Sequence, residues 1–195
     1  MHLLHLDSSI QGDASVSRTL SAAIVEQLRR SHGALELSYR DLGAQPLPHL
    51  TLPGFATPEA TATLDAFLAA DIVVIGAAMY NFGIPTQLKG WFDHILVSGK
   101  TFRYSERGVE GLAGGKRVLV ALARGGHYAD GPAAAMEHAE THLRAMLGFI
   151  GITQPEFVVA EGVAIGPNQR ETAVASSLSR IALLPGDFAP AEFAH

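Results

Sequence analysis

The sequence predicts an α/β fold with a three-layer α/β/α arrangement: a five-stranded parallel sheet covered by helices on both faces. Short apolar runs alternate with longer segments whose apolar residues recur every three or four positions, the patterns of buried strands and amphipathic helices. The apolar runs at 71–76 and 117–123 are continuous, which is typical of strands covered on both faces. Five strand–helix units in succession favour right-handed crossovers between parallel strands.

Three strands and two helices are expected in the first half of the chain. The strands are predicted at 3–6, 35–40 and 71–76. Between the first two, Leu20, Ile24 and Leu28 recur at four-residue spacing, which indicates one face of a helix.

The second helix is expected after a proline-rich loop over 45–58. Thr57-Pro58-Glu59 provides a hydroxyl cap, a proline for the first turn and an acidic side chain near the positive end of the helix. Leu64, Phe67 and Leu68 are predicted to form the buried face of this helix.

The second half of the chain repeats the alternation. A helix is expected from about Pro85, a strand at 117–123, a helix ending at Gly148, a strand at 157–160, and a last helix opened by the capping box Asn168-x-x-Glu171. The predicted buried faces of these helices are Leu88, Trp91, Phe92 and Ile95; Met136, Ala139, Leu143, Met146 and Leu147; and Val174, Leu178 and Ile181. The aromatic segment 101–111 is too long for a plain connection and fits neither pattern.

Composition excludes several classes of function. At 195 residues, with 48% apolar and 17% charged residues, the chain is expected to form a single domain over 1–195. Its net charge of −5, with no basic run, argues against a nucleic-acid or anionic-membrane partner. The absence of cysteine excludes a thiol nucleophile, disulfides and iron–sulfur clusters. The N-terminal segment lacks the basic residues of a signal peptide, so we expect a cytoplasmic protein.

Three loops follow predicted strands at the carboxyl edge of the sheet, where open parallel sheets bind ligands. The loop 7–17 is rich in serine and ends at a helix N-terminus, which suits a phosphate or is simply a serine-rich helix cap. The loop 77–85 presents Met79, Tyr80, Asn81 and Phe82, which suit a flat heterocycle or cap the core.

The third loop, 124–132, contains Gly125-Gly126, which lets a ligand approach the backbone or forms a plain turn. Other chemistries lack their motifs: Gly-x-Gly-x-x-Gly, the phosphate-binding P-loop and the Gly-x-Ser-x-Gly elbow are all absent. His138 and His142 have helical spacing but no evident third ligand, so we expect no metal site.

Four segments together resemble the FMN-dependent NADH-azoreductases, the azo/quinone reductases of the flavodoxin-like superfamily. They are Ser8-Ser9 with Ser15-Val16-Ser17; Met79-Tyr80-Asn81-Phe82; Thr101-Phe102-Arg103-Tyr104 with Gly111-Leu112; and Arg124-Gly125-Gly126 followed by 147–151. With Ala160-Glu161-Gly162 the resemblance covers about residues 3–166. It implies a flavodoxin-like fold with strand order 2-1-3-4-5, tightly bound FMN, and a homodimer with active sites at its interface.

The resemblance also implies roles for individual residues. The implied FMN-binding residues are Ser9, Ser15, Val16, Ser17, Met79, Tyr80, Asn81, Phe82, Ala123, Arg124, Gly125 and Gly126. Ala123 stands where the family usually has serine. Tyr104 and Phe149 are expected to stack a quinone or azo arene. Tyr128, or His127, is the candidate donor to the reduced flavin, unless that loop is a plain surface loop.

The implied function is ping-pong, two-electron transfer from NADH to quinones and azo compounds through FMN. No side-chain acid is obligatory in such a reaction. One alternative is a flavodoxin-type FMN electron carrier that does not oxidise NADH directly, although such carriers are usually shorter and more acidic. A second alternative is a regulatory protein of the same fold without FMN.

Overall fold

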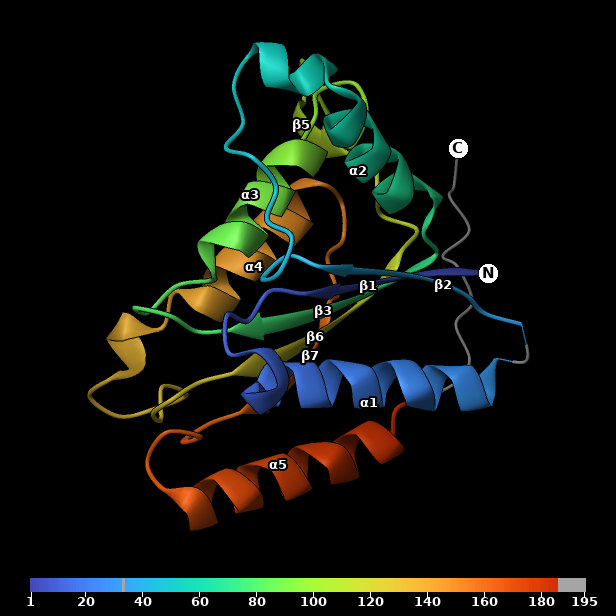
Figure 1. Ribbon diagram of the computed structural model, residues 1–195. Coiled ribbons are helices and arrows are strands. Elements are labelled where there is room, and N and C mark those ends of the chain that lie inside the picture. Colours follow the sequence, from blue (N-terminus) through green and yellow to red (C-terminus); the bar gives the residue numbers. More distant parts are fainter. Residues whose placement is uncertain (33, 186–195) are drawn as a thin grey trace.

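The structure, a computed structural model, describes residues 1–32 and 34–185. A parallel sheet lies between α1 and α5 on one face and α2, α3 and α4 on the other (Figure 1). The elements in chain order are β1 (His2–Asp7), α1 (Val16–Ser31), β2 (Glu36–Asp41), α2 (Pro58–Ala69), β3 (Ile72–Ala78), α3 (Thr86–Ile95), β4 (Phe102–Ser105), β5 (Gly108–Gly111), β6 (Arg117–Ala123), α4 (Ala139–Phe149), β7 (Glu156–Ala160) and α5 (Pro167–Ala182). The predicted α/β/α layering is therefore confirmed.

The sheet has the strand order β2-β1-β3-β6-β7, and all of its pairs are parallel. The predicted order 2-1-3-4-5 is wrong in this numbering, because the chain forms two strands that the sequence did not predict. These strands, β4 and β5, make a separate antiparallel hairpin from the aromatic segment 101–111. The strands in the fourth and fifth positions of the main sheet are consequently β6 and β7.

The two faces of the sheet bury separate cores. Every residue of β3 and β6 is buried, as the continuous apolar runs predict. Val73 and Ile75 of β3 pack beneath α2, α3 and α4, whereas Ile72 and Val74 pack beneath α1 and α5. Each fully buried aliphatic side chain contributes about 1.5–3 kcal/mol to folding, so these strands anchor both outer layers.

The apolar stripes predicted for α2 and α5 are only partly buried. Thr57 caps α2 as expected, because its hydroxyl accepts a hydrogen bond from the Ala60 N–H. Leu68 and Leu178, however, are exposed. Both residues lie on outer helices at the border of the apolar stripe, where no further layer covers them.

Two helix starts differ from the prediction. Met136 lies outside α4 in a short 3-10 turn and is exposed, because the Glu137 carboxylate accepts hydrogen bonds from the first N–H groups of the helix and starts it at Ala139. The expected capping box at Asn168 does not form. Pro167 begins α5 instead, since its ring fixes φ for a helical first turn and its missing N–H leaves no donor unpaired.

The β4–β5 hairpin depends on a close contact between two glycine backbones. A Cβ atom on Gly111 would lie 2.1 Å from the backbone nitrogen of Gly151, so only glycine fits there. Phe102 of the hairpin packs on Phe149 at the end of α4, with ring centroids 4.7 Å apart. The hairpin is thereby attached to the C-terminal ends of α3 and α4.

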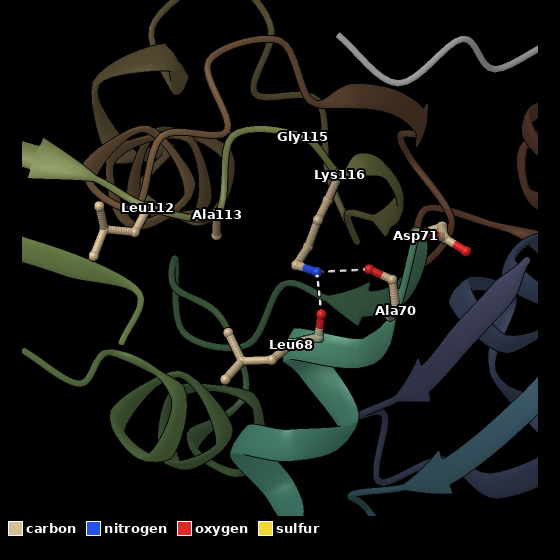
Figure 2. Close-up of a pocket in the computed structure, with 7 residues that line it drawn as sticks. All are labelled: Leu68, Ala70, Asp71, Leu112, Ala113, Gly115 and Lys116. Carbon is tan, nitrogen blue, oxygen red and sulfur yellow. Dashed lines mark hydrogen bonds between the residues drawn. The ribbon is translucent and has the colours of Figure 1, made fainter. Parts of the chain in front are cut away.

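A small cavity of about 220 Å³ lies at the opposite, amino edge of the sheet. Figure 2 shows that the Lys116 ammonium fills part of it and donates hydrogen bonds to the carbonyl oxygens of Leu68 and Ala70, at 2.8 and 2.6 Å. Lys116 also lies over the ring of Phe67. The lysine therefore caps the C-terminus of α2, which explains the polar lining of this cavity without a ligand.

Among residues 1–32 and 34–185, every helix is too short or too polar to cross a membrane.

Candidate active site

The three loops expected to bind a ligand meet at the carboxyl edge of the sheet. β1 and β3 are neighbours there, and the chain leaves them toward opposite edges, so a crevice forms between their ends. A hydrogen bond of 2.9 Å between the hydroxyls of Ser9 and Tyr80 joins the first loop to the second. The second loop contacts the third through the rings of Phe82 and Tyr128, whose centroids are 6.3 Å apart.

The first loop forms a cradle of buried serine hydroxyls at the N-terminus of α1. Ser9, Ser15 and Ser17 are almost completely buried, and the hydroxyls of the last two are 3.1 Å apart. Ser15 also caps α1 by accepting a hydrogen bond from the Arg18 N–H. Within the described chain, the backbone N–H groups of Val16 and Ser17 have no acceptor. Buried hydroxyls beside unpaired N–H groups of a helix N-terminus suit a phosphate.

Arg18, the cation nearest to this cradle in sequence, is held by carboxylates. Its guanidinium lies 2.7 Å from Asp41 and 3.8 Å from Asp7, and it donates a hydrogen bond to the Ser9 carbonyl oxygen. The hydrogen bond from Arg18 lowers the pKa of Asp41, and this effect outweighs the opposing effect of burial. Arg18 therefore holds the first loop in place, and its positive charge is neutralised by Asp7 and Asp41, so it offers a phosphate no net charge.

The second loop reverses direction within four residues. The backbones of Tyr80 and Gly83 bond to each other, and the Met79 N–H donates to the carbonyl of Ala123 at the end of β6. Asn81 and Phe82 adopt left-handed conformations, with φ of 48° and 71°. Such values are rare for residues other than glycine and are found at ligand sites. Both side chains are exposed, so the Asn81 amide is not buried within this chain.

A hollow of about 580 Å³ lies along the second loop. Its lining residues are Ile10, Met79, Tyr80, Asn81, Gly83, Ile84, Pro85, Thr86 and Gln87. The hollow thus lies between the first two loops. The third loop does not line it but contacts Phe82 of the second loop through Tyr128. The walls of the hollow combine apolar side chains with the polar groups of the second loop, a lining that suits a flat aromatic ligand.

The third loop is fixed by its neighbour after β7. The carbonyl groups of Gly125 and Gly126 accept hydrogen bonds from Ala164 and Gly162, whereas their own N–H groups have no acceptor in the described chain. Two unpaired N–H groups side by side suit the polar edge of a heterocycle. Tyr128 is half-buried, and its N–H donates to the carboxylate of Glu161.

Three of the expected binding residues point away from the crevice. The side chains of Val16 and Ala123 pack in the core beneath α1 and α5, so only their backbone groups are available at the site. The guanidinium of Arg124 is buried and is held by Glu137, Glu140 and Glu161.

Tyr104 and Phe149 are not brought to the three loops within one chain. Tyr104 lies on the β4–β5 hairpin and Phe149 ends α4, and both rings contact Phe102. The second loop leads into the N-terminal end of α3, and the ten residues of that helix span about 15 Å. Tyr104 is 71% exposed, so its ring is available to a second molecule.

The sequence analysis missed the carboxylates that surround Arg124. A signal was nevertheless present: Arg124 and Glu161 each follow a strand directly, and β6 and β7 are neighbours in the sheet. Opposite charges at the carboxyl ends of neighbouring parallel strands are close enough to pair. The implied strand order 2-1-3-4-5 already placed the strands 117–123 and 157–160 side by side, so this pair could have been inferred from the sequence.

The residues present fit FMN. The buried serines and unpaired N–H groups at α1 suit its phosphate, and the second and third loops offer apolar surface and N–H donors to its ring.

Comparison with known proteins agrees with this geometry. Residues 1–184 match a family described as having a flavodoxin-like fold. The FMN-dependent NADH:quinone oxidoreductase of Methylorubrum populi is 55% identical, over 94% of this chain and 98% of that protein. The protein of the same name from Xanthomonas campestris pv. campestris is 53% identical, over 95% and 100%.

Two solved structures from Bacillus anthracis are also similar. An azoreductase superposes with a TM-score of 0.84 at 31% identity and covers 93% of this chain and 97% of its own. An FMN-dependent NADH-azoreductase, solved in complex with FMN, superposes with a TM-score of 0.80 at 25% identity, over 93% and 100%.

Replacing Asp41 is expected to change stability in a pH-dependent way. Because its pKa is lower in the folded state, ionised Asp41 stabilises the fold above its unfolded pKa of about 3.9, and this contribution is lost as the pH falls through the folded value. Asp41→Asn should lower the free energy of unfolding by about 2 kcal/mol near neutral pH. Urea denaturation at a series of pH values should show the difference from the wild type shrinking below about pH 4. Replacing the exposed Asp65 by asparagine is the control, and an equal profile for both variants would contradict the role of Asp41.

Removing two hydroxyls of the cradle should weaken the binding of FMN more than the binding of riboflavin, which lacks the phosphate. Each hydroxyl that faces a charged acceptor contributes about 1.5–3 kcal/mol, or roughly ten- to a hundred-fold in affinity. In Ser9→Ala/Ser17→Ala the affinity gap between the two flavins should therefore shrink, as measured by fluorescence titration. Ser8→Ala is the matched control, because the Ser8 hydroxyl is buried but donates to the carbonyl of Gly76. An unchanged gap in the double variant would place the phosphate elsewhere.

Proposed function

The chain belongs to the family of FMN-dependent NADH:quinone oxidoreductases with a flavodoxin-like fold, and from this we propose that it oxidises NADH and reduces quinones and azo compounds with tightly bound FMN. The observation that carries the proposal is the phosphate cradle at the N-terminus of α1, which opens beside the second and third loops. The similarity to an azoreductase solved with FMN supports the same cofactor.

We assign the phosphate of FMN to the hydroxyls of Ser9, Ser15 and Ser17 and to the N–H groups of Val16 and Ser17. Residues 79–82 of the second loop would hold the ring. The backbone from Ala123 through Arg124 to Gly126 provides its other polar edge.

When bound, FMN supplies the two-electron chemistry, accepting a hydride from NADH and passing it to a quinone or azo compound. The chain's task is to hold each flat substrate in turn against one face, which gives a ping-pong cycle. The N–H groups of Gly125 and Gly126 stabilise negative charge that develops at the ring edge during reduction. The Tyr128 ring lies beside Gly126, where a Cβ atom would come 3.2 Å from it, and its hydroxyl is the candidate donor.

A flavodoxin-type electron carrier is the less favoured function. The relatives that cover 94–95% of this chain are oxidoreductases that use NADH, according to their names. Such an enzyme works where NADH is available, so we place this single-domain protein, residues 1–195, in the cytoplasm.

A homodimer is part of the proposal, because one chain leaves its substrate site without a wall. Tyr104 and Phe149, proposed to stack the substrate, lie far from the three loops of their own chain. Exposed apolar side chains occur both near the loops, at Ile10 and Phe82, and on the hairpin, at Tyr104. Two-fold pairing would place the hairpin of one chain beside the loops of the other.

The activity can be tested with purified protein, NADH and a simple 1,4-naphthoquinone. The expected result is direct oxidation of NADH, with parallel lines in double-reciprocal plots because the first product leaves before the second substrate binds. Protein stripped of flavin is the control and should be inactive until FMN is added. Oxidation of NADH only after a separate reductase is added would identify an electron carrier instead.

The homodimer can be tested by light scattering, which should give twice the chain mass of 20.6 kDa. Tyr104→Ala should lower the rate of quinone reduction while flavin affinity stays the same, because the ring would contact substrate and not the cradle. A monomer that remains fully active at nanomolar concentration would refute the dimeric site.

A further inference from the structure

Arg124 lies at the centre of a buried ionic cluster beside the proposed flavin site. Although directly adjacent to Gly125-Gly126, its side chain is only 4% exposed. One guanidinium nitrogen lies 2.9 Å from Glu161, and the other lies 2.6 Å from Glu140 and 3.2 Å from Glu137. We call these four residues the Arg124 cluster.

The cluster joins three segments that are separate in sequence. Arg124 follows β6, Glu161 follows β7, and the remaining two glutamates stand at the start of α4. One oxygen of Glu161 accepts hydrogen bonds from both the Arg124 side chain and the Tyr128 N–H. One carboxylate thus holds the third loop at two points, Arg124 and Tyr128.

The arrangement of carboxylates in the cluster suits an arginine better than a lysine at position 124. Glu161 stays ionised, because the Tyr128 N–H and Arg124 lower its pKa by more than burial raises it. Glu140 is shared with Arg144, whose guanidinium lies 2.7 Å away. A planar guanidinium reaches carboxylates on two sides at once, whereas a lysine ammonium is a single point of charge. Removing Arg124 would leave carboxylates buried without their partner.

We propose that Arg124 is a positioning residue, which acts through Glu161 to aim the N–H groups of Gly125 and Gly126 at the ring edge of the flavin. This inference rests on the proposed function. It replaces direct contact between the Arg124 side chain and FMN by an indirect role, because both terminal nitrogens already bind carboxylates. The backbone bonds from Gly162 and Ala164 hold the loop near the sheet, and the Arg124 cluster fixes the direction of the free N–H groups.

The chain provides a matched control at the other end of the same strand. Arg117, at the start of β6, is also buried and forms an ion pair with Glu156 at 2.7 Å. Its guanidinium donates a further hydrogen bond to the carbonyl of Pro185. Arg117→Met therefore removes a comparable buried ion pair at the edge of the sheet opposite the flavin.

The experiment measures the affinity of flavin-free protein for FMN and for riboflavin, together with thermal stability. In Arg124→Met both flavins should bind about ten-fold more weakly, by a similar factor, because the ring edge and not the phosphate loses its partners. Arg124→Lys should not restore the affinity. Arg117→Met should lower stability while its flavin affinities stay within about two-fold of the wild type.

Three outcomes would overturn the inference. In the first, Arg124→Met and Arg117→Met have equal flavin affinities. In the second, Arg124→Met weakens the binding of FMN but not of riboflavin, which would show that the guanidinium contacts the phosphate. In the third, Arg124→Lys restores the wild-type affinity.

If Arg124→Met does not fold, Glu161→Gln takes its place. The glutamine keeps an acceptor for the Tyr128 N–H but loses the charge that holds Arg124, so both flavins should again bind more weakly, and unchanged binding would overturn the inference. Failure of the proposed function is distinct: without a flavin site the wild type itself would bind neither flavin, and loss of NADH oxidation alone would leave the order of these affinities unchanged.

Discussion

The pairing of β3 between β1 and β6 is the constraint on which the remaining structure depends. β3 is buried at every position and carries side chains into both cores. The Asp7 side chain of its partner β1 lies over Gly76, where a Cβ atom would come 2.2 Å from a carboxylate oxygen, so only glycine fits at that position. Because all five strands run in the same direction, fixing this pair also fixes the edge at which the three loops meet.

Two arginines, the half-buried Arg18 and the buried Arg124, organise that edge, and carboxylates neutralise the charge of both. Arg18 is held by Asp41 and Asp7 and supports the first loop, whereas Arg124 is held by three glutamates and supports the third. Binding of an anionic cofactor then falls to hydroxyls and backbone N–H groups. Such groups are neutral and held in place by the fold, so they discriminate by geometry more than by charge.

The layers, the five strands of the main sheet and the three loops could be predicted from the sequence, because apolar periodicity reports burial directly. The hairpin could not, since its pairing depends on the contact between Gly111 and Gly151, which are far apart in the chain. The start of α4 depends on the Glu137 carboxylate. Met136 has the spacing of the apolar stripe, so the pattern extended the helix to it, although its side chain is exposed. At the site, the residue types indicated the chemistry, but the direction of the Arg124 side chain also depends on Glu137 and Glu140, at a helix start that the apolar pattern placed wrongly.

The neutral lining of the phosphate cradle has a consequence for the rate at which a cofactor arrives. A cleft with unpaired lysines or arginines attracts anions from a distance, and added salt slows their association. Here Arg18 is neutralised by two carboxylates, the Arg170 guanidinium donates to the Ala14 carbonyl beside the cradle, and the protein as a whole carries a charge of −5. Long-range attraction of a phosphate dianion is therefore weak, and we expect the rate of its capture to depend only slightly on added salt.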